Sequence, residues 1–227
     1  MTNDGGGPGS RTADPVLEQI LDTGIVAIAR LPSADQAVDI ARALQAGGVS
    51  CLEITLNTPG ALHGIAQIAR LGEKFMVGAG TILDETSARQ AILAGARFLV
   101  TPCVTPAVAR AAKRYGCVAL IGALTPTEIL SAWEAGADLV KVFPASVFGP
   151  EYIRAVRGPL PQVRLAPTGG IGVENAAEFI RAGADVLCVG GTLIDSQAVA
   201  TGRWDVLEAR AREFTARVLQ GRADRAK

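Results

Sequence analysis

Short apolar runs alternate with longer stretches of helical periodicity along most of the chain. Each run is short enough for a buried strand, and each stretch between runs has one apolar face. Several stretches begin with a capping Ser, Thr or Asp, as 33–48, 84–96 and 125–137 do, and these stretches and 172–184 end in Ala-Gly-Gly or Ala-Gly-Ala. The predicted strands are 25–30, 51–56, 76–81, 98–102, 117–123, 139–145, 163–170 and 186–193.

Strands that alternate with helices in this way imply a parallel sheet, and the number of strands favours a closed α/β barrel, the (β/α)₈ or TIM barrel. The segment 14–24 predicts an extra N-terminal helix that covers the bottom of the barrel. An open, doubly wound sheet is the alternative, but no G-x-G-x-x-G follows the first strand. The Gly- and Pro-rich start predicts a disordered tail over 1–12, and the barrel domain is expected over 13–227.

The composition limits the kinds of partner that the protein is expected to bind. Hydrophobic residues make up 49% of the chain and charged residues 19%, which is typical of a compact globular protein. The 22 basic residues equal the 22 acidic ones, so no charge excess favours nucleic acid or an anionic membrane as a partner. No apolar run approaches the roughly 18 residues that span a membrane, and the start lacks the pattern of a signal peptide, so we expect a cytoplasmic protein. Four scattered cysteines and one histidine predict no metal site.

Alternation within two strands places two charged side chains inside the barrel. On the second strand, Glu53 falls on the inward face, and on the sixth strand Lys141 does so too. No other central strand position carries a charge, since Arg30 ends the first strand nearer the rim. One interpretation is a buried ion pair that only fills the barrel, although desolvation makes such pairs a poor source of stability.

The other interpretation is an active site. Burial disfavours the charged form of Lys141, and a neutral amine can attack a ketone or aldehyde to form a Schiff base. Schiff-base chemistry needs several proton transfers, for which Glu53 is suitably placed. This chemistry requires neither a metal nor an organic cofactor.

Glycine-rich loops after the strands predict anion binding. Thr168, Gly169 and Gly170 follow the seventh strand, and Gly191 and Thr192 end the eighth, at the corner where barrels often bind phosphate.

A second anionic group, such as a carboxylate, could bind Gly80 and Thr81 after the third strand, although a layer of small residues explains this motif equally well. Pro102 and Phe143 are expected to shape the mouth of the pocket.

Taken together, "LEITL", "GAGT", "KVFPA" and "PTGGI" resemble the 2-keto-3-deoxy-6-phosphogluconate / 4-hydroxy-2-oxoglutarate aldolase family, class I aldolases, from about Ile25 to Leu193. The resemblance implies that Lys141 forms a Schiff base with pyruvate and that Glu53 is the general acid/base. It further implies that Thr81 contacts the pyruvate carboxylate and that residues 168–170 form the phosphate loop. A homotrimer is implied as well.

Two departures concern the substrate. Asn57 stands where gluconate-type members have an arginine that holds the substrate carboxylate. Asn57 and Arg30 resemble the branch that acts on 2-keto-3-deoxy-6-phosphogalactonate, while Thr192 replaces a usual serine. We therefore expect a small phosphorylated 2-keto-3-deoxy acid as substrate, with its C4 configuration open. A phosphosugar isomerase or epimerase without a covalent adduct, or a non-catalytic phosphometabolite-binding barrel, are the alternatives.

Overall fold

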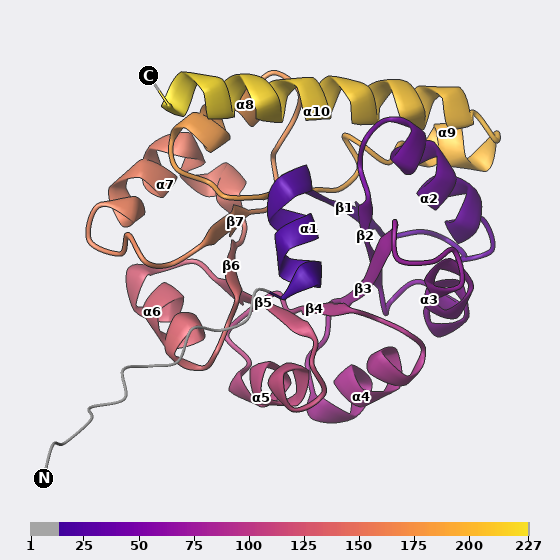
Figure 1. Cartoon of the computed structure of the whole chain (residues 1–227), viewed down its shortest axis with the longest axis horizontal. Helices are drawn as coiled ribbons and strands as arrows, with labels where there is room; N and C mark the ends of the chain where they lie inside the picture. The colour runs from indigo at the N-terminus through magenta and orange to yellow at the C-terminus, as the bar shows by residue number, and fades with distance from the viewer. Residues whose placement is uncertain (1–13, 227) are drawn as a thin grey trace, which may run out of the picture.

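The computed structural model describes residues 14–226, and these form an eight-stranded parallel barrel surrounded by helices (Figure 1). The hydrogen-bonded strand order is β7-β6-β5-β4-β3-β2-β1-β8, and a single parallel bridge between Thr168 and Cys188 closes the seam from β7 to β8. The predicted fold is confirmed, and each predicted run contains one strand. The strands are β1 Ile25–Ala29, β2 Cys51–Thr55, β3 Met76–Gly80, β4 Phe98–Val100, β5 Val118–Ala123, β6 Leu139–Val142, β7 Leu165–Pro167 and β8 Leu187–Val189.

Helices follow the strands around the outside. Several have the caps that the sequence predicts: Asp84 accepts a hydrogen bond from the Ser87 N–H at the start of α4, and Thr125 forms a capping box with Glu128 at the start of α6. The helices are α1 Pro15–Thr23, α2 Ala37–Ala46, α3 Ala61–Ala69, α4 Glu85–Leu93, α5 Pro106–Arg114, α6 Pro126–Glu134, α7 Gly149–Arg157, α8 Ala176–Arg181, α9 Ser196–Ala200 and α10 Trp204–Arg225, with a 3₁₀ turn, η1, at Ala145–Val147.

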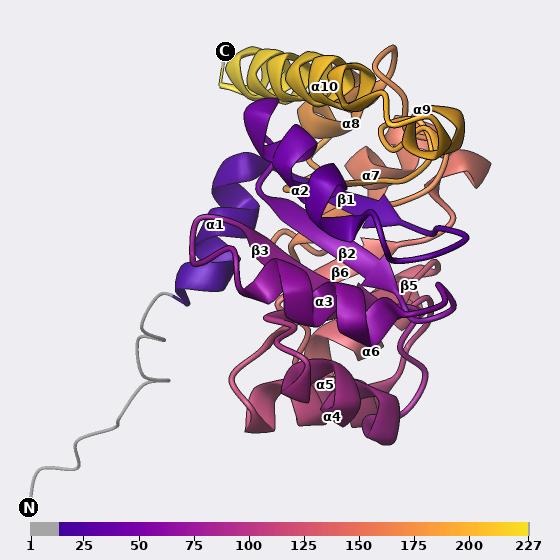
Figure 2. The ribbon, with the colours of Figure 1, turned by 90° about the vertical axis from the view of Figure 1, so that its right-hand side faces the viewer.

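Two helices complete the barrel. Figure 1 shows α1 lying across the ring of strands, and Figure 2 shows it at one end of the barrel. Val16 and Ile20 of α1 pack against the apolar side chains inside the barrel, so the predicted N-terminal helix covers this end. The long helix α10, which the sequence analysis did not single out, packs on both α8 and α2 and so covers the seam between the last and first strands.

Alternate residues of each strand belong to two separate apolar cores. Leu52, Ile54, Val140 and Val142 pack outward with the helices, as the alternation predicts. The interior core instead contains residues such as Leu139, together with Cys51, Phe98, Leu120 and Cys188. The predicted inward orientation of the second and sixth strands is therefore confirmed.

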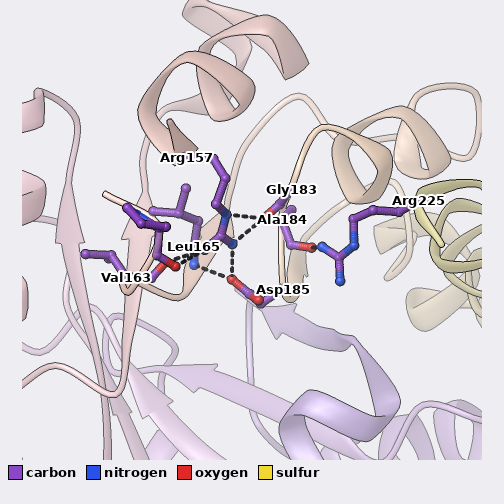
Figure 3. A network of polar contacts seen from close by, with 8 residues as sticks. Arg157, Val163, Leu165, Gly183, Ala184, Asp185 and Arg225 are labelled. Carbon is purple, nitrogen blue, oxygen red and sulfur yellow. Dashed lines mark hydrogen bonds and ion pairs between the residues drawn. The ribbon is translucent and has the colours of Figure 1, made fainter. Parts of the chain in front are cut away.

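A network of polar contacts fastens the start of β7 to the start of β8 (Figure 3). Asp185 accepts a hydrogen bond from the Leu165 N–H at 2.8 Å and forms an ion pair with Arg157. Arg157 also donates to the Gly183 carbonyl, and Arg225 of α10 donates to the Ala184 carbonyl. These contacts hold together the starts of two strands that share only a single isolated bridge, between Thr168 and Cys188.

No helix within residues 14–226 is long and apolar enough to cross a membrane. The predicted tail, 1–12, lies outside the described residues, and the domain limits of 13–227 stay a prediction.

Candidate active site

A pocket of about 380 Å³ lies at the carboxyl ends of the strands, away from α1. It gathers most of the predicted site residues from the loops and ends of seven strands. Those that line it are Arg30, Glu53, Thr81, Pro102, Lys141, Phe143, Thr168, Gly169 and Gly191. The barrel thus brings together side chains that are spread over more than 160 positions of the sequence.

Lys141 and Glu53 are buried in the floor of this pocket. Lys141 is central in β6, beside Gly122 of β5, and is 6% exposed. Glu53 is central in β2, beside Gly78 of β3, and is 1% exposed. The Lys141 amine lies 5.4 Å from the centre of the Phe143 ring, which also lines the pocket.

The Glu53 carboxyl has no hydrogen-bond partner for either oxygen among residues 14–226, although both oxygens are buried. Burial raises the pKa of this carboxyl above its ordinary range, and the positive charges of Lys141 and Arg30 offset part of that rise. Native proteins rarely leave a buried carboxyl unpartnered, because its lost hydration is not repaid. A group in this condition, aimed into a pocket beside a lysine, is typical of a site for proton transfer.

Gly80 makes room for Glu53. A Cβ atom at position 80 would lie only 1.6 Å from Oε1 of Glu53, so any side chain there would displace the carboxyl. Gly80 does not itself line the pocket. Its predicted contact with a substrate carboxylate stays a prediction, and its evident structural role is steric.

Thr81 lies at the pocket wall in a left-handed backbone conformation with φ of 54°, which no other non-glycine residue within 14–226 adopts. This conformation is costly for a β-branched residue. It is held from both sides, because the Gly80 carbonyl accepts from the Leu56 N–H and the Ile82 N–H donates to the Val100 carbonyl. Thr81 therefore lines the pocket from a backbone conformation that the hydrogen bonds of its neighbours hold.

The predicted phosphate corner is partly assembled. Thr168, Gly169 and Gly191 line the pocket, whereas Gly170 and Thr192 do not. The Thr192 hydroxyl donates to the Ile171 carbonyl at 2.6 Å, which ties the loop after β8 to the loop after β7. A phosphate contact by Thr192 stays a prediction, but this hydrogen bond already uses its proton.

Asn57 lies outside the pocket. It lines a separate, open depression with Leu56 and His63, between α3 and α4. The geometry therefore lends no support to the predicted carboxylate contact of Asn57.

The pocket also contains residues that the sequence analysis did not select. Ile28, Leu31, Gly190, Ile194 and Ser196 line it. Ser196 begins the short helix α9, where Asp195 caps the first turn by accepting from the Ala198 N–H. The only signal for this helix in the sequence is a capping residue after the eighth strand, which does not indicate that the helix reaches the pocket.

A (β/α)₈ barrel is the architecture of many enzymes, and here a pocket at the carboxyl ends of its strands holds a buried lysine and a carboxyl without a hydrogen-bond partner among residues 14–226. Comparison with known proteins narrows the class. The sequence profile described as "KDPG and KHG aldolase" matches residues 16–210. The chain belongs to this family, and the protein is an aldolase, which is a lyase.

Individual relatives agree with this placement. The 2-dehydro-3-deoxy-phosphogluconate aldolase of Pseudomonas aeruginosa is 39% identical over 196 residues, which cover 83% of this chain and 87% of that protein. The 2-dehydro-3-deoxy-6-phosphogalactonate aldolase of Escherichia coli is 36% identical over 74% of this chain and 82% of its own. Among solved structures, the KDPG aldolase of Legionella pneumophila, with pyruvate captured as a covalent carbinolamine, has a TM-score of 0.80 and 25% identity, over 88% of this chain and 97% of that one.

Proposed function

We propose that the protein is a class I aldolase that cleaves 2-keto-3-deoxy-6-phosphogluconate, or its galactonate epimer, to pyruvate and glyceraldehyde 3-phosphate. The observation that carries this proposal is the burial of Lys141 and Glu53 in one pocket beside glycines 169, 190 and 191, with no hydrogen-bond partner for the Glu53 carboxyl among the described residues. The relatives from Pseudomonas and Escherichia bear the names of aldolases for these two epimeric acids.

Lys141 is the proposed nucleophile. Its amine attacks the C2 ketone to form a carbinolamine, and loss of water gives an iminium ion. When the C4 hydroxyl loses its proton, the electron pair of the C3–C4 bond moves to the iminium, and the aldehyde leaves. The enamine that remains is protonated at C3, and hydrolysis of the iminium releases pyruvate and the free lysine.

Glu53 is the proposed general acid and base for these steps. Its raised pKa brings the carboxyl nearer to the pH at which it can both give and accept a proton. Because neither oxygen is engaged by other described residues, both are available to the substrate or to a water. The absence of a Cβ at Gly80 is what allows the carboxyl this position.

The two ends of the substrate would be held by different parts of the mouth. We assign the phosphate to the backbone N–H groups of Gly169 and Gly191 at one corner of the pocket, which Thr168 also lines. The Thr168 N–H and hydroxyl already donate to the Val142 and Ala166 carbonyls, so a phosphate contact by Thr168 stays a prediction. Thr81 and Arg30 are the proposed contacts of the carboxylate. Arg30 lines the pocket, which supports a galactonate-type substrate. Asn57 lies outside the pocket and lends no such support.

A homotrimer is proposed from the family resemblance, and the cytoplasmic location expected from the sequence also stays a proposal. Sedimentation equilibrium of the purified chain tests the trimer, with a molecular mass of three chains expected.

The function is tested by measuring pyruvate release, coupled to lactate dehydrogenase, from the two epimeric phosphorylated acids and from 4-hydroxy-2-oxoglutarate. We expect cleavage of at least one phosphorylated acid, with kcat/KM about 10-fold or more above the unphosphorylated substrate, since charged hydrogen bonds to the phosphate would be lost. Lys141→Ala is the control and should release no pyruvate. If the wild-type protein releases no pyruvate from any of the three acids, the proposed function is wrong.

A further inference from the structure

Two buried threonines at the mouth of the barrel have no place in the chemistry above. Thr55 is the last residue of β2 and Thr58 follows it in the loop to α3, and they are 0% and 2% exposed. Their hydroxyl oxygens lie 3.2 Å apart. Neither residue lines the pocket, so neither can touch the substrate there.

The two hydroxyls form one continuous chain of hydrogen bonds. The Thr55 hydroxyl donates to the Ala29 carbonyl at 3.2 Å, which leaves its oxygen free to accept. Thr58 accepts from the Leu31 N–H at 3.1 Å, and its own proton is then directed to Thr55. Every donor is used once, and the chain runs from Leu31 through Thr58 and Thr55 to Ala29.

This chain of hydrogen bonds holds the backbone on both sides of Arg30. Ala29, which ends β1, and Leu31, which lines the pocket, are the neighbours of Arg30 in sequence. A second tie, from the Ala34 N–H to the Pro59 carbonyl at 3.0 Å, joins the same two loops further out. The loop that carries Arg30 is therefore fastened to the loop after β2 rather than left to solvent.

Arg30 needs such support from its backbone. Its side chain is exposed and makes no hydrogen bond or ion pair with any residue in the range 14–226, yet it lines the pocket close enough to Glu53 to act on that carboxyl. A long side chain with no partner keeps much of its rotamer freedom. The backbone position of Arg30 is therefore what limits where its guanidinium group can lie.

We propose that Thr55 and Thr58 are positioning residues that hold Arg30 at the pocket for the anionic substrate. The inference rests on the proposed function, because it takes Arg30 to be a substrate contact. Preorganisation of this kind affects substrate capture more than the covalent steps at Lys141.

A double-mutant cycle tests the proposal. Thr58→Val removes the hydroxyl at nearly constant shape, and we expect a loss of about 10-fold in kcat/KM, mainly through a higher KM. In an Arg30→Ala background the same substitution should cost less than about 2-fold, since the side chain it positions is gone. Equal losses in the two backgrounds would overturn the proposal.

Two further variants separate positioning from general stability. Thr58→Ser keeps the hydroxyl and should restore kcat/KM to within about 2-fold of wild type. Thr23→Val is the matched control, because Thr23 forms a similar hydroxyl pair with Ser50 at the other end of the barrel, and it should leave kcat/KM unchanged. If Thr58→Val does not fold, Thr58→Ala removes the same hydroxyl without adding bulk and completes the same cycle.

The failure of this inference and that of the proposed function can be told apart. A wild-type protein that releases no pyruvate disproves the function, whereas an active enzyme with additive losses disproves only the positioning role. Hydrogen exchange of the Leu31 amide is independent of turnover. It should speed up by about 10-fold or more in Thr58→Val but not in Thr23→Val, and unchanged exchange would contradict the hydrogen-bond chain on which the proposal is built.

Discussion

Two buried carboxyl groups lie at opposite ends of the barrel, and their surroundings differ. Asp138, where β6 begins, is 7% exposed, accepts a hydrogen bond from the Ala119 N–H at 2.8 Å and pairs with Lys113. Glu53, in the pocket, is 1% exposed and has no hydrogen-bond partner within residues 14–226. Oδ2 of Asp138 is thus held by two partners, whereas neither oxygen of Glu53 is held by a residue in the range 14–226.

The difference indicates that the base of the barrel stabilises the fold and that the pocket end carries the chemistry. At the base, Asp138 joins β5 to β6, and Asp185 joins β7 to β8 by the same kind of contact to a strand N–H. Both aspartates follow the sequence "AGA" at the end of a helix, so the same motif joins neighbouring strands at two places. In the pocket, burying the Glu53 carboxyl without a partner among the described residues costs stability, which is expected where a group must react. The comparison predicts that substitutions at the mouth abolish activity and spare the fold, and that substitutions at the base do the reverse.

The largest expected effect is at Lys141. Lys141→Ala removes the proposed nucleophile, and kcat/KM for cleavage should fall on the order of 10⁴-fold or more. Circular dichroism should remain that of the folded barrel, because the Lys141 amine faces the Phe143 ring and forms no hydrogen bond or ion pair with another residue in the range 14–226. A variant that keeps more than about a tenth of the activity would remove Lys141 from the mechanism.

Glu53→Gln should lower kcat about 10²- to 10⁴-fold, the usual contribution of a general acid or base. The same substitution should raise the free energy of unfolding near neutral pH by about 1–3 kcal/mol, since it removes the cost of a buried, unpartnered carboxylate. Denaturant unfolding measures the second effect. A variant less stable than wild type at pH 7 would mean that the carboxyl supports the fold after all.

The stability gain from Glu53→Gln should depend on pH. The folded state raises the pKa of Glu53, so the folded protein holds this proton more tightly than the unfolded chain does. Wild-type stability from this group is therefore full below the ordinary carboxyl pKa of about 4.3 and is lost as pH rises toward the raised value. The difference between variant and wild type should grow over that interval, and a constant difference would contradict the shift.

At the base, Asp138→Ala should lower the free energy of unfolding by about 1–3 kcal/mol, because the Ala119 N–H and Lys113 lose their partner. The kcat/KM of the folded fraction should stay within about 2-fold of wild type. A large loss of kcat/KM without loss of stability would show that the two ends are not independent.

The smallest expected effect concerns the strained backbone at Thr81. Glycine adopts a φ of 54° without penalty, so Thr81→Gly should be more stable than Thr81→Ala by about 1 kcal/mol. Both variants lack the hydroxyl and should lose similar amounts of activity. Thermal unfolding of the pair measures the strain, and equal stabilities would mean that this backbone is not strained.

The sequence predicts part of this difference between the two ends of the barrel. The alternation of a strand places Glu53 and Lys141 inside the barrel, because side-chain direction there has a period of two and depends only on local geometry. The ring of eight strands then brings them into one pocket. Residues whose direction is set by strand pleat were thus predictable one strand at a time.

Loop residues were harder to place from the sequence. Asn57 is only two residues beyond β2 but turns away from the pocket, and Ser196 reaches it from the helix after β8. The steric need for Gly80 beside Glu53 and the hydroxyl chain through Thr55 and Thr58 depend on contacts between neighbouring strands and loops. No periodic pattern in the sequence indicates such contacts, so these roles follow only from the three-dimensional structure.

The central claim is that Lys141 forms a covalent adduct with a 2-keto acid, and reductive trapping tests it most directly. The wild-type protein is incubated with pyruvate and borohydride, and the modified residue is located by mass spectrometry of its peptides. We expect one carboxyethyl group on Lys141, and none on the chain in Lys141→Ala. An unmodified Lys141 in the wild-type protein, or the same adduct on another lysine, would contradict it.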